Sequence, residues 1–405
     1  MNRPGGSASL MHEPQPAPVV RTGLNVEFGA VLTVLLATGW VANHFVALMP
    51  AISERQHLSV ATLDAIFGIY AVGLLPGLLL GGRASDAFGL RAVALTGSAT
   101  AAVGTVAMLL SQQPEVLTVG RLIVGVGVGL AMSSGTAWAS DLKGPAGAAT
   151  AGAVLIVGFA IGPFAGGLIT GAGEAGVRIS FGVAAALVVT AMAVMIATAR
   201  RPPHAVTEDS YDPSRSTQAQ GVIRALSWAL PLAPWVFASA TLGFVTIPAR
   251  VHTGLAAPVA AGFAALIVNG ASGVVQIIAR AARWGPQAGT TGAVLAALSY
   301  ALIAVAPPTM TLALSLPLLL LLGCASGLSL REGLIDLEAA APQRVRGTLT
   351  GVFYSVTYIG FGLPLVLTTG GPRLTQLILA AMAVLASTAA ISRTMRLRRD
   401  SHRQS

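Results

Sequence analysis

The sequence predicts an all-helical integral membrane protein whose twelve transmembrane spans form two groups of six. Hydrophobic residues make up 54% of the 405 residues and charged residues only 10%, far below the charged fraction of about a quarter in soluble domains. The apolar residues are gathered into runs of about twenty, the length that a helix needs to cross a bilayer. The longest polar connection follows the sixth run, which divides the chain into halves of like orientation.

The spans follow from the apolar runs taken in order. The first six runs cover residues 29–51, 62–82, 91–111, 116–138, 147–170 and 178–199. The other six cover residues 226–247, 257–279, 288–307, 311–330, 347–369 and 374–392. We therefore predict an N-terminal bundle over 29–199 and a C-terminal bundle over 226–392, joined by a cytoplasmic loop over 200–225.

The charged residues predict the orientation of the chain in the membrane and argue against a nucleic-acid partner. Most of the 24 Lys and Arg fall in alternate loops, and the positive-inside rule then places both termini in the cytoplasm. Residues 1–28, rich in Pro, Gly and Ser, are expected to be a disordered tail. Residues 393–405 form a basic tail that anchors to lipid rather than to nucleic acid, despite the net charge of +9. The low Lys content points to a bacterial cell membrane.

Catalysis and bound cofactors are not expected. Cys324 is the only cysteine, so an intramolecular disulfide and a cysteine-rich metal site are excluded. The sequence has no Gly-x-x-x-x-Gly-Lys-Ser/Thr loop for ATP and no evident nucleophile and base constellation. We predict that the protein is not an enzyme and holds no cofactor or metal.

A glycine-rich decapeptide lies in the fifth run. Gly158, Gly162 and Gly166 recur at every fourth residue, and Pro163 and Gly167 complete the pattern. On a helix the three glycines form one stripe against which a second helix can pack closely. Pro163 removes a helical hydrogen bond and favours a bend. Ordinary close packing in a membrane is the alternative interpretation.

Two further motifs lie nearby. The connection after the second run carries five residues of a conspicuous loop pattern, Gly82, Ser85, Asp86, Gly89 and Arg91. The fourth run carries an arginine followed by three alternate glycines, Arg121, Gly125, Gly127 and Gly129. An arginine within an apolar span is costly and is a functional candidate, unless it extends to the interface.

Together these motifs resemble those of the major facilitator superfamily, and the decapeptide resembles the signature of its drug:proton antiporters. The loop pattern departs from the family at Ala84, Ala87 and Leu90. The resemblance implies two six-helix bundles that expose a central site alternately, and contact of Asp86 with the start of the eleventh helix, near Gly347 and Thr348. The fourth-helix motif is associated with proton transfer. Members are commonly monomers.

Few titratable groups lie within the spans. His44 can change charge near neutral pH, although it could merely hydrogen-bond a neighbouring helix. Asp64 is a second proton-coupling candidate, with N-terminal capping as its alternative role. Glu332 and Asp336 either line the cytoplasmic mouth or pair with Arg344 and Arg346. The candidate cavity residues are Asn43, His44, Trp235, Asn269, Gln276, Tyr354 and Tyr358.

The expected function is export of a small amphipathic compound, driven by protons that move inward. Tyr354 and Tyr358 lie one turn apart, and their stacked rings would form a wall suited to apolar or cationic compounds. Arg121 and His44 are the favoured coupling residues, and Asp86 is expected to control the access state. The alternatives are a symporter that imports a small metabolite and, less favoured, a membrane sensor that transports nothing.

Overall fold

The computed structural model describes residues 18–198, 215–342 and 345–404. Within these residues, twelve helices are long and apolar enough to cross a membrane, and each predicted run overlaps one of them. The predicted twelve-span, all-helical fold is therefore confirmed. Residues 1–17 of the predicted tail and most of the predicted central loop lie outside the described residues.

The N-terminal half contains six helices in chain order. They are α1 (Pro18–Asn43), α2 (Phe45–Gln56), α3 (Val60–Phe88), α4 (Leu90–Leu110), α5 (Pro114–Gly171) and α6 (Gly176–Thr198). α1 and α2 together form the first span, and α5 contains the fourth and fifth spans. The two spans of α5 separate at Lys143 and Gly144, whose backbone angles are not helical.

The C-terminal half contains six spans built from shorter pieces. The seventh span comprises α7 (Arg215–Ala229), α8 (Ala233–Thr241), η1 (Leu242–Thr246) and η2 (Pro248–Arg250). The next three are α9 (Ala257–Ala281), α10 (Gln287–Val305) and α11 (Leu312–Ala340). The eleventh comprises α12 (Arg346–Tyr358), η4 (Ile359–Gly362) and α13 (Leu363–Thr369), and α14 (Gly371–Gln404) is the twelfth.

Several helices extend beyond the predicted boundaries. α1 begins at Pro18, α7 begins at Arg215 and α14 continues to Gln404. Proline is favourable in the first turn of a helix, and arginine is a good helix former outside the bilayer. Hydropathy locates only the part of a helix that lies in the membrane, so these extensions were not predictable from it.

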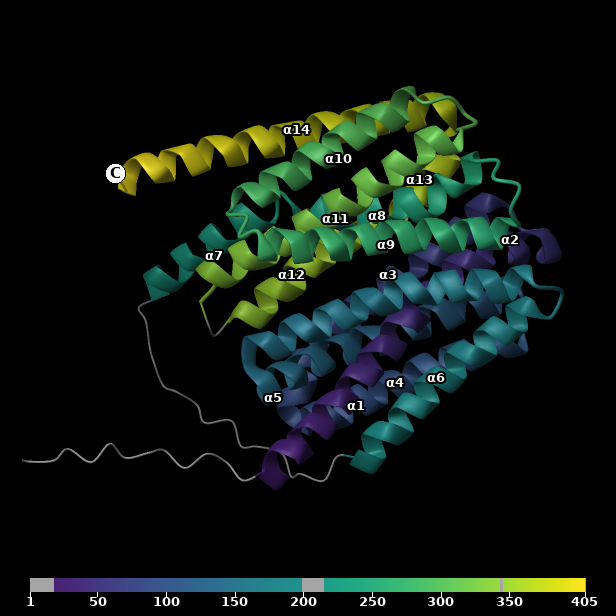
Figure 1. Cartoon of the computed structure of the whole chain (residues 1–405), viewed down its shortest axis with the longest axis horizontal. Helices are drawn as coiled ribbons and strands as arrows, with labels where there is room; N and C mark the ends of the chain where they lie inside the picture. The colour runs from purple at the N-terminus through teal and green to yellow at the C-terminus, as the bar shows by residue number, and fades with distance from the viewer. Residues whose placement is uncertain (1–17, 199–214, 343–344, 405) are drawn as a thin grey trace, which may run out of the picture.

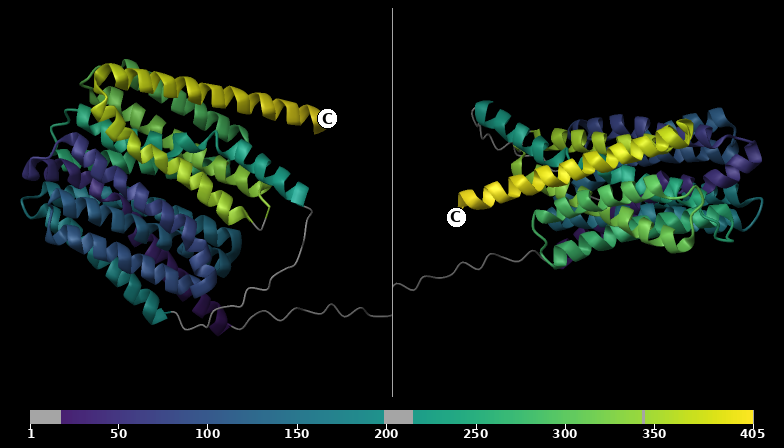
Figure 2. Two further views of the ribbon diagram at one scale, coloured as in Figure 1. Left: turned by 180° about the vertical axis from the view of Figure 1, so that it is seen from behind. Right: turned by 90° about the horizontal axis from the view of Figure 1, so that it is seen from above.

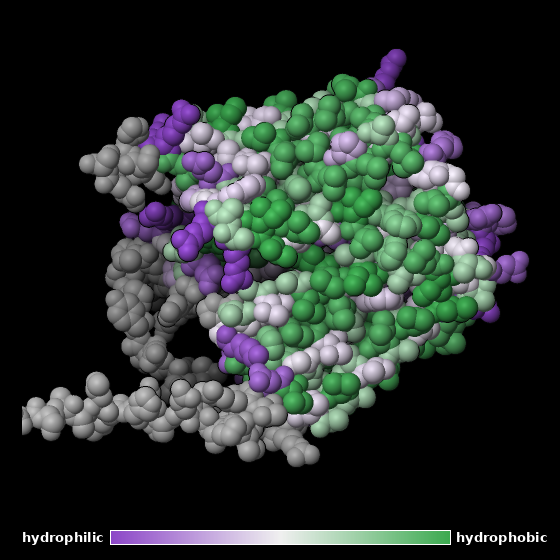
Figure 3. All heavy atoms as spheres, viewed as in Figure 1, coloured by the Kyte–Doolittle hydropathy of each residue, from purple (hydrophilic) through white to green (hydrophobic). Residues whose placement is uncertain are grey.

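The two halves form two bundles that lie side by side (Figures 1 and 2). They meet along two seams, with α5 and α2 against α9 in one and α3 against α12, η4 and α13 in the other. Apolar residues cover most of the face seen in Figure 3, and hydrophilic residues gather at the two ends of the helices. This distribution is that of a protein surrounded by lipid, with both ends in water.

Candidate functional site

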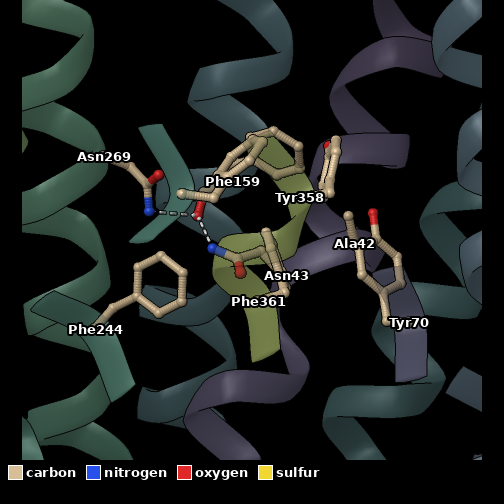
Figure 4. Close-up of a pocket in the computed structure, with 9 residues that line it drawn as sticks. Ala42, Asn43, Tyr70, Phe159, Phe244, Asn269, Tyr358 and Phe361 are labelled. Carbon is tan, nitrogen blue, oxygen red and sulfur yellow. Dashed lines mark hydrogen bonds between the residues drawn. The ribbon is translucent and has the colours of Figure 1, made fainter. Parts of the chain in front are cut away.

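A small pocket lies where helices of the two bundles meet. Four lining residues come from the N-terminal bundle and five from the C-terminal bundle (Figure 4); they are Ala42, Asn43, Tyr70, Phe159, Phe237, Phe244, Asn269, Tyr358 and Phe361. The space between them holds about one water molecule. A larger compound therefore fits only after the two bundles move apart at this level.

The polar centre of the pocket is a backbone carbonyl. In a regular helix the carbonyl of Phe159 would accept from the N–H of residue 163, but Pro163 has no N–H. Two side-chain amides donate to this oxygen instead: Asn43 Nδ2 from α1 at 2.9 Å and Asn269 Nδ2 from α9 at 3.4 Å (Figure 4). The proline of the decapeptide thus creates a hydrogen-bonding point that both bundles share.

Aromatic rings form most of the remaining wall. Tyr358 packs on Phe237 with 4.4 Å between ring centroids, and on Phe361 with 5.2 Å. Phe361 also packs on Tyr70 of the opposite bundle at 5.8 Å. The hydroxyls of Tyr70 and Tyr358 are buried without a hydrogen-bond partner. The wall offers rings for an apolar body and two hydroxyls for a polar group.

Arg121 lies directly behind this wall, fully buried within the N-terminal bundle. Its Nη1 donates to the Ala42 carbonyl at 3.2 Å, and its Nε and Nη2 have no partner. The guanidinium carbon lies 4.4 Å from the ring centroid of Tyr70 and 4.8 Å from that of Phe45. The alternative prediction, that Arg121 extends to the membrane interface, is wrong because the side chain turns into the bundle.

His44 occupies the break between α1 and α2 and is fully buried. Its Nδ1 hydrogen-bonds with the carbonyl of Val41, 3.1 Å away in the same span, while Nε2 has no partner. Its ring meets Phe181 of α6 edge to face. The residue does not line the pocket, and the predicted hydrogen bond to a neighbouring helix is not formed. Its role in proton coupling stays a prediction.

Asp64 joins the two bundles rather than capping α3. The cap is Ser59, whose side chain accepts from the backbone N–H of Thr62. Asp64 lies farther along the helix, only 1% exposed, and its Oδ2 accepts a 2.5 Å hydrogen bond from Thr368 Oγ1 of α13. The capping alternative is therefore wrong. We call the end of the molecule that holds this contact the Asp64 end.

The glycine stripe of α5 packs within its own bundle. A Cβ added at Gly158 would lie 2.5 Å from the carbonyl oxygen of Leu36, and one at Gly162 would lie 2.9 Å from the Cα of Trp40. Both atoms belong to α1, so this pair of glycines does not form the seam between bundles. The helix continues without a break through Pro163.

The end of the decapeptide does meet the other bundle. A Cβ at Gly167 would collide with the carbonyl of Pro258 in α9. Phe164 packs edge to face on Phe263 of α9, with 5.1 Å between ring centroids. Gly262 of α9 in turn approaches the Pro163 carbonyl. The decapeptide thus contacts α1 through one part and α9 through another.

The glycines of the fourth-span motif bring three helices together. Gly125 and Gly129 approach the backbone of α3 at Tyr70 and Leu74, and Gly127 approaches α4 at Ala101. No side chain would fit at any of these points. Close packing of α5 on α3 places Arg121 against the ring of Tyr70.

The loop motif lies between α3 and α4. Gly89 joins them with a φ of +86°, a conformation that favours glycine. Arg91 donates to the Ile196 carbonyl at the end of α6. Asp86 is exposed and makes no hydrogen bond or ion pair with the described part of the chain. Thr348 is exposed as well, so the expected contact of Asp86 with this residue at the start of the eleventh span is not formed here.

Besides His44, three predicted cavity residues lie outside the pocket. Trp235 is buried against Tyr300, with 5.9 Å between ring centroids. Gln276 donates to the Ser272 carbonyl of its own helix. Tyr354 packs on Phe353 rather than on Tyr358, so the predicted pair of stacked tyrosines is not formed. Both tyrosines belong to α12, but their rings meet different neighbours: Phe353 for Tyr354, and Phe237 and Phe361 for Tyr358.

The acidic pair of α11 has partners other than those predicted. Glu332 pairs with the adjacent Arg331, and Asp336 pairs with Arg393 of α14 at 2.5 Å. Arg393 also donates to the Pro286 carbonyl. Arg344 lies outside the described residues and the side chain of Arg346 is not described. The cluster ties α14 to α11 within one bundle.

Sequence reasoning missed most of the aromatic wall. Ala42, Tyr70, Phe159, Phe237, Phe244 and Phe361 line the pocket but were not predicted. One of these residues could have been predicted from the sequence, because a proline within a helix leaves the carbonyl four residues before it without its helical donor. That rule applied to Pro163 indicates Phe159. The others are apolar residues in apolar runs, which the sequence alone does not distinguish from packing residues.

Two like-oriented six-helix bundles around a central pocket define a class of polytopic membrane transporters. Residues 30–364 match the family described as Major Facilitator Superfamily. The chain belongs to this superfamily and is a secondary transporter of that type. No curated protein sequence gives a significant match.

Solved structures share the fold over nearly the whole chain. A structure of the peptide transporter POT in complex with sulfate is 14% identical, with a TM-score of 0.69, covering 91% of this chain and 94% of that one. The POT family transporter PepTSo is 12% identical, with a TM-score of 0.71 and coverages of 92% and 97%. A structure described as showing substrate recognition in proton dependent oligopeptide transporters is 12% identical, with a TM-score of 0.71, and covers 92% of this chain and 98% of that one. The drug antiporter branch finds no support among them.

Proposed function

We propose that this protein is a proton-coupled secondary transporter that carries a small amphipathic compound through the pocket between its bundles. The observation that carries this proposal is the composition of the pocket. Its side chains are aromatic or apolar apart from the two asparagine amides, and no charged side chain lines it. Such a surface suits a compound with an apolar body and one or two hydrogen-bonding groups.

Alternating access requires the two bundles to separate at one end at a time. At the Asp64 end they are joined by the Asp64 to Thr368 hydrogen bond and by the packing of Gly167 on α9. In the pocket they are joined by the longer bond from Asn269 to the Phe159 carbonyl. A substrate that accepts from Asn269 or donates to Phe159 would replace this bond, which couples binding to separation of the bundles.

Export by proton antiport is the first candidate direction. It is supported by the decapeptide on α5, which resembles the antiporter signature and contacts α9 of the other bundle. Asp64, His44 and Arg121 are the proposed coupling groups, since each is a buried titratable or charged side chain in the N-terminal bundle. Asp86 remains the proposed residue for control of the access state.

Import by proton symport is the second candidate direction, and the comparisons favour it. The solved structures of similar fold include proteins described as proton dependent oligopeptide transporters. A peptide with two charged ends would find no charged lining residue in this pocket. An imported compound is therefore expected to be an amphipathic metabolite rather than a peptide.

Vesicle transport decides between the two directions. The purified protein is reconstituted in vesicles, and a panel of dyes, antibiotics and metabolites is screened with the inside either acidic or alkaline. Antiport predicts uptake into acidic vesicles, and symport predicts uptake into alkaline ones. A protonophore and an Asn43→Leu, Asn269→Leu double variant serve as controls. Absence of gradient-driven movement for every compound would refute proton-coupled transport.

A further inference from the structure

The charge of Arg121 has no carboxylate partner in the described part of the chain. Its single hydrogen bond runs to the Ala42 carbonyl, the rings of Phe45, Phe67 and Tyr70 lie around its guanidinium, and the other titratable group within reach of its charge is His44. The ion pairs of Arg331 with Glu332 and of Arg393 with Asp336 lie in the C-terminal bundle, away from Arg121. Ring faces and one carbonyl stabilise a cation only in part, since a buried charge normally requires an opposite charge.

The same two residues that hold Arg121 also line the pocket. Its guanidinium contacts the Ala42 carbonyl and the Tyr70 ring, and Ala42 and Tyr70 form part of the pocket wall. Its field therefore reaches the pocket across one layer of atoms in a region of low dielectric constant, where charges act strongly over several ångströms.

No negative charge opposes this field inside the pocket. The lining contains no acidic residue. Asp64, the acidic side chain buried in the same bundle, bonds to Thr368 at the Asp64 end. His44 is also buried in this bundle, and neither of its protonation states is negative. We therefore expect a positive field in the pocket, whereas the sequence predicted a wall suited to apolar or cationic compounds.

We infer that the substrate is an amphipathic anion, with its apolar body on the rings of Phe237, Phe244 and Phe361 and its anionic group toward Ala42 and Tyr70. This inference rests on the proposed function and specifies its substrate class. The anion supplies the charge that Arg121 lacks, and the two tyrosine hydroxyls without partners can donate to it. A cationic compound of the same size would be repelled by the positive charge of Arg121, and no acidic residue of the lining would offset this repulsion.

Three matched probes test the charge preference. Phenylacetate, phenylacetamide and phenethylamine share one ring and carry a negative, no and a positive charge. Their binding to the purified full chain is measured by calorimetry at neutral pH. We expect phenylacetate to bind most tightly and phenethylamine to bind at least about ten-fold more weakly. Equal affinities, the reverse order, or no binding of phenylacetate would overturn the inference.

Variants at one position separate charge from shape. Arg121→Gln should abolish the preference for phenylacetate over phenylacetamide while phenylacetamide binding stays within about two-fold, and Arg121→Lys should retain the preference. Arg396→Gln, a charge change on the exposed part of α14, is the matched control and should leave the preference unchanged. Size-exclusion profiles report whether each variant is folded. A preference that persists in folded Arg121→Gln overturns the inference.

The outcomes also distinguish this inference from the proposed function. Vesicles that move only neutral or cationic compounds would support proton-coupled transport and refute an anionic substrate. A chain that binds phenylacetate through Arg121 but moves no compound of the panel under any gradient would support the anion site and refute proton-coupled transport.

Discussion

Pro163 determines what the Phe159 carbonyl does. Without a helical donor at residue 163, this oxygen accepts from Asn43 of its own bundle and from Asn269 of the other. A residue often described as a helix breaker here leaves the fifth span helical on both sides of it and exposes one acceptor at the centre of the protein. The decapeptide contains neither a charge nor a polar side chain, yet it provides the polar centre of the pocket.

Replacing the proline should therefore change the pocket more than the helix. In Pro163→Ala the new N–H can bond to the Phe159 carbonyl and compete with both asparagines. We expect thermal stability to be kept or raised, and transport to fall about ten-fold, which corresponds to roughly one hydrogen bond. Transport in vesicles and thermal unfolding measure the two effects.

Pro76→Ala provides the matched control. Pro76 also lies within a helix, α3, but the carbonyl it releases belongs to Val72, which is 57% exposed on the outer surface. This variant should leave transport unchanged. If Pro163→Ala transports as well as Pro76→Ala does, the exposed carbonyl has no role in the cycle.

The two asparagines should act together. Both donate to one oxygen, so the effects of Asn43→Leu and Asn269→Leu on KM are expected to be non-additive. Each loss should cost about 0.5–1.5 kcal/mol, with a coupling energy of at least about 0.5 kcal/mol between residues that share a partner. Gln276→Leu should have little effect, because Gln276 donates to the Ser272 carbonyl of its own helix, whereas Asn269 donates both to the Ala265 carbonyl of that helix and to the Phe159 carbonyl. Strict additivity would argue that the shared oxygen does not link them.

The sequence predicted the fold well because membrane spans are long, apolar and bounded by charge. It predicted the pocket poorly. Asn43, Asn269 and Tyr358 lie there as expected, but His44, Trp235, Gln276 and Tyr354 do not. Placement around a helix axis depends on which face meets which neighbour, and an apolar run does not specify that face. Apolar residues such as Phe244 carry no mark in the sequence that separates a lining role from a packing role.

Two glycines of the decapeptide should differ in what they control. Gly158→Val would clash with α1 inside one bundle and should lower the free energy of unfolding by about 1–3 kcal/mol. Gly167→Val would clash with α9 across the seam, so it should disfavour closure of the Asp64 end and reduce transport while each bundle stays folded. Gly152→Val controls for the effect of valine on the helix, because a Cβ added at Gly152 would meet no other atom within 4 Å. Equal loss of stability in both variants would contradict this division.

The contact at the Asp64 end should hold that end closed. Thr368→Val removes the hydroxyl that donates to Asp64, whereas Asp64→Asn keeps an oxygen that can accept from it. Loss of about 1 kcal/mol should increase the open population roughly five-fold. Pulsed electron paramagnetic resonance between spin labels at the exposed residues Val60 and Leu374 measures the two populations.

Neighbouring positions provide the control for this prediction. Thr369→Val alters the adjacent residue, whose hydroxyl is exposed and donates to the Leu365 carbonyl of its own helix, so the label distances should not change. Asp64→Asn should keep the closed distance but lose proton-driven accumulation if this carboxyl carries the proton, because the amide does not titrate. A closed end in Thr368→Val, together with full proton coupling in Asp64→Asn, would remove Asp64 from both roles and leave His44 and Arg121 as the coupling candidates.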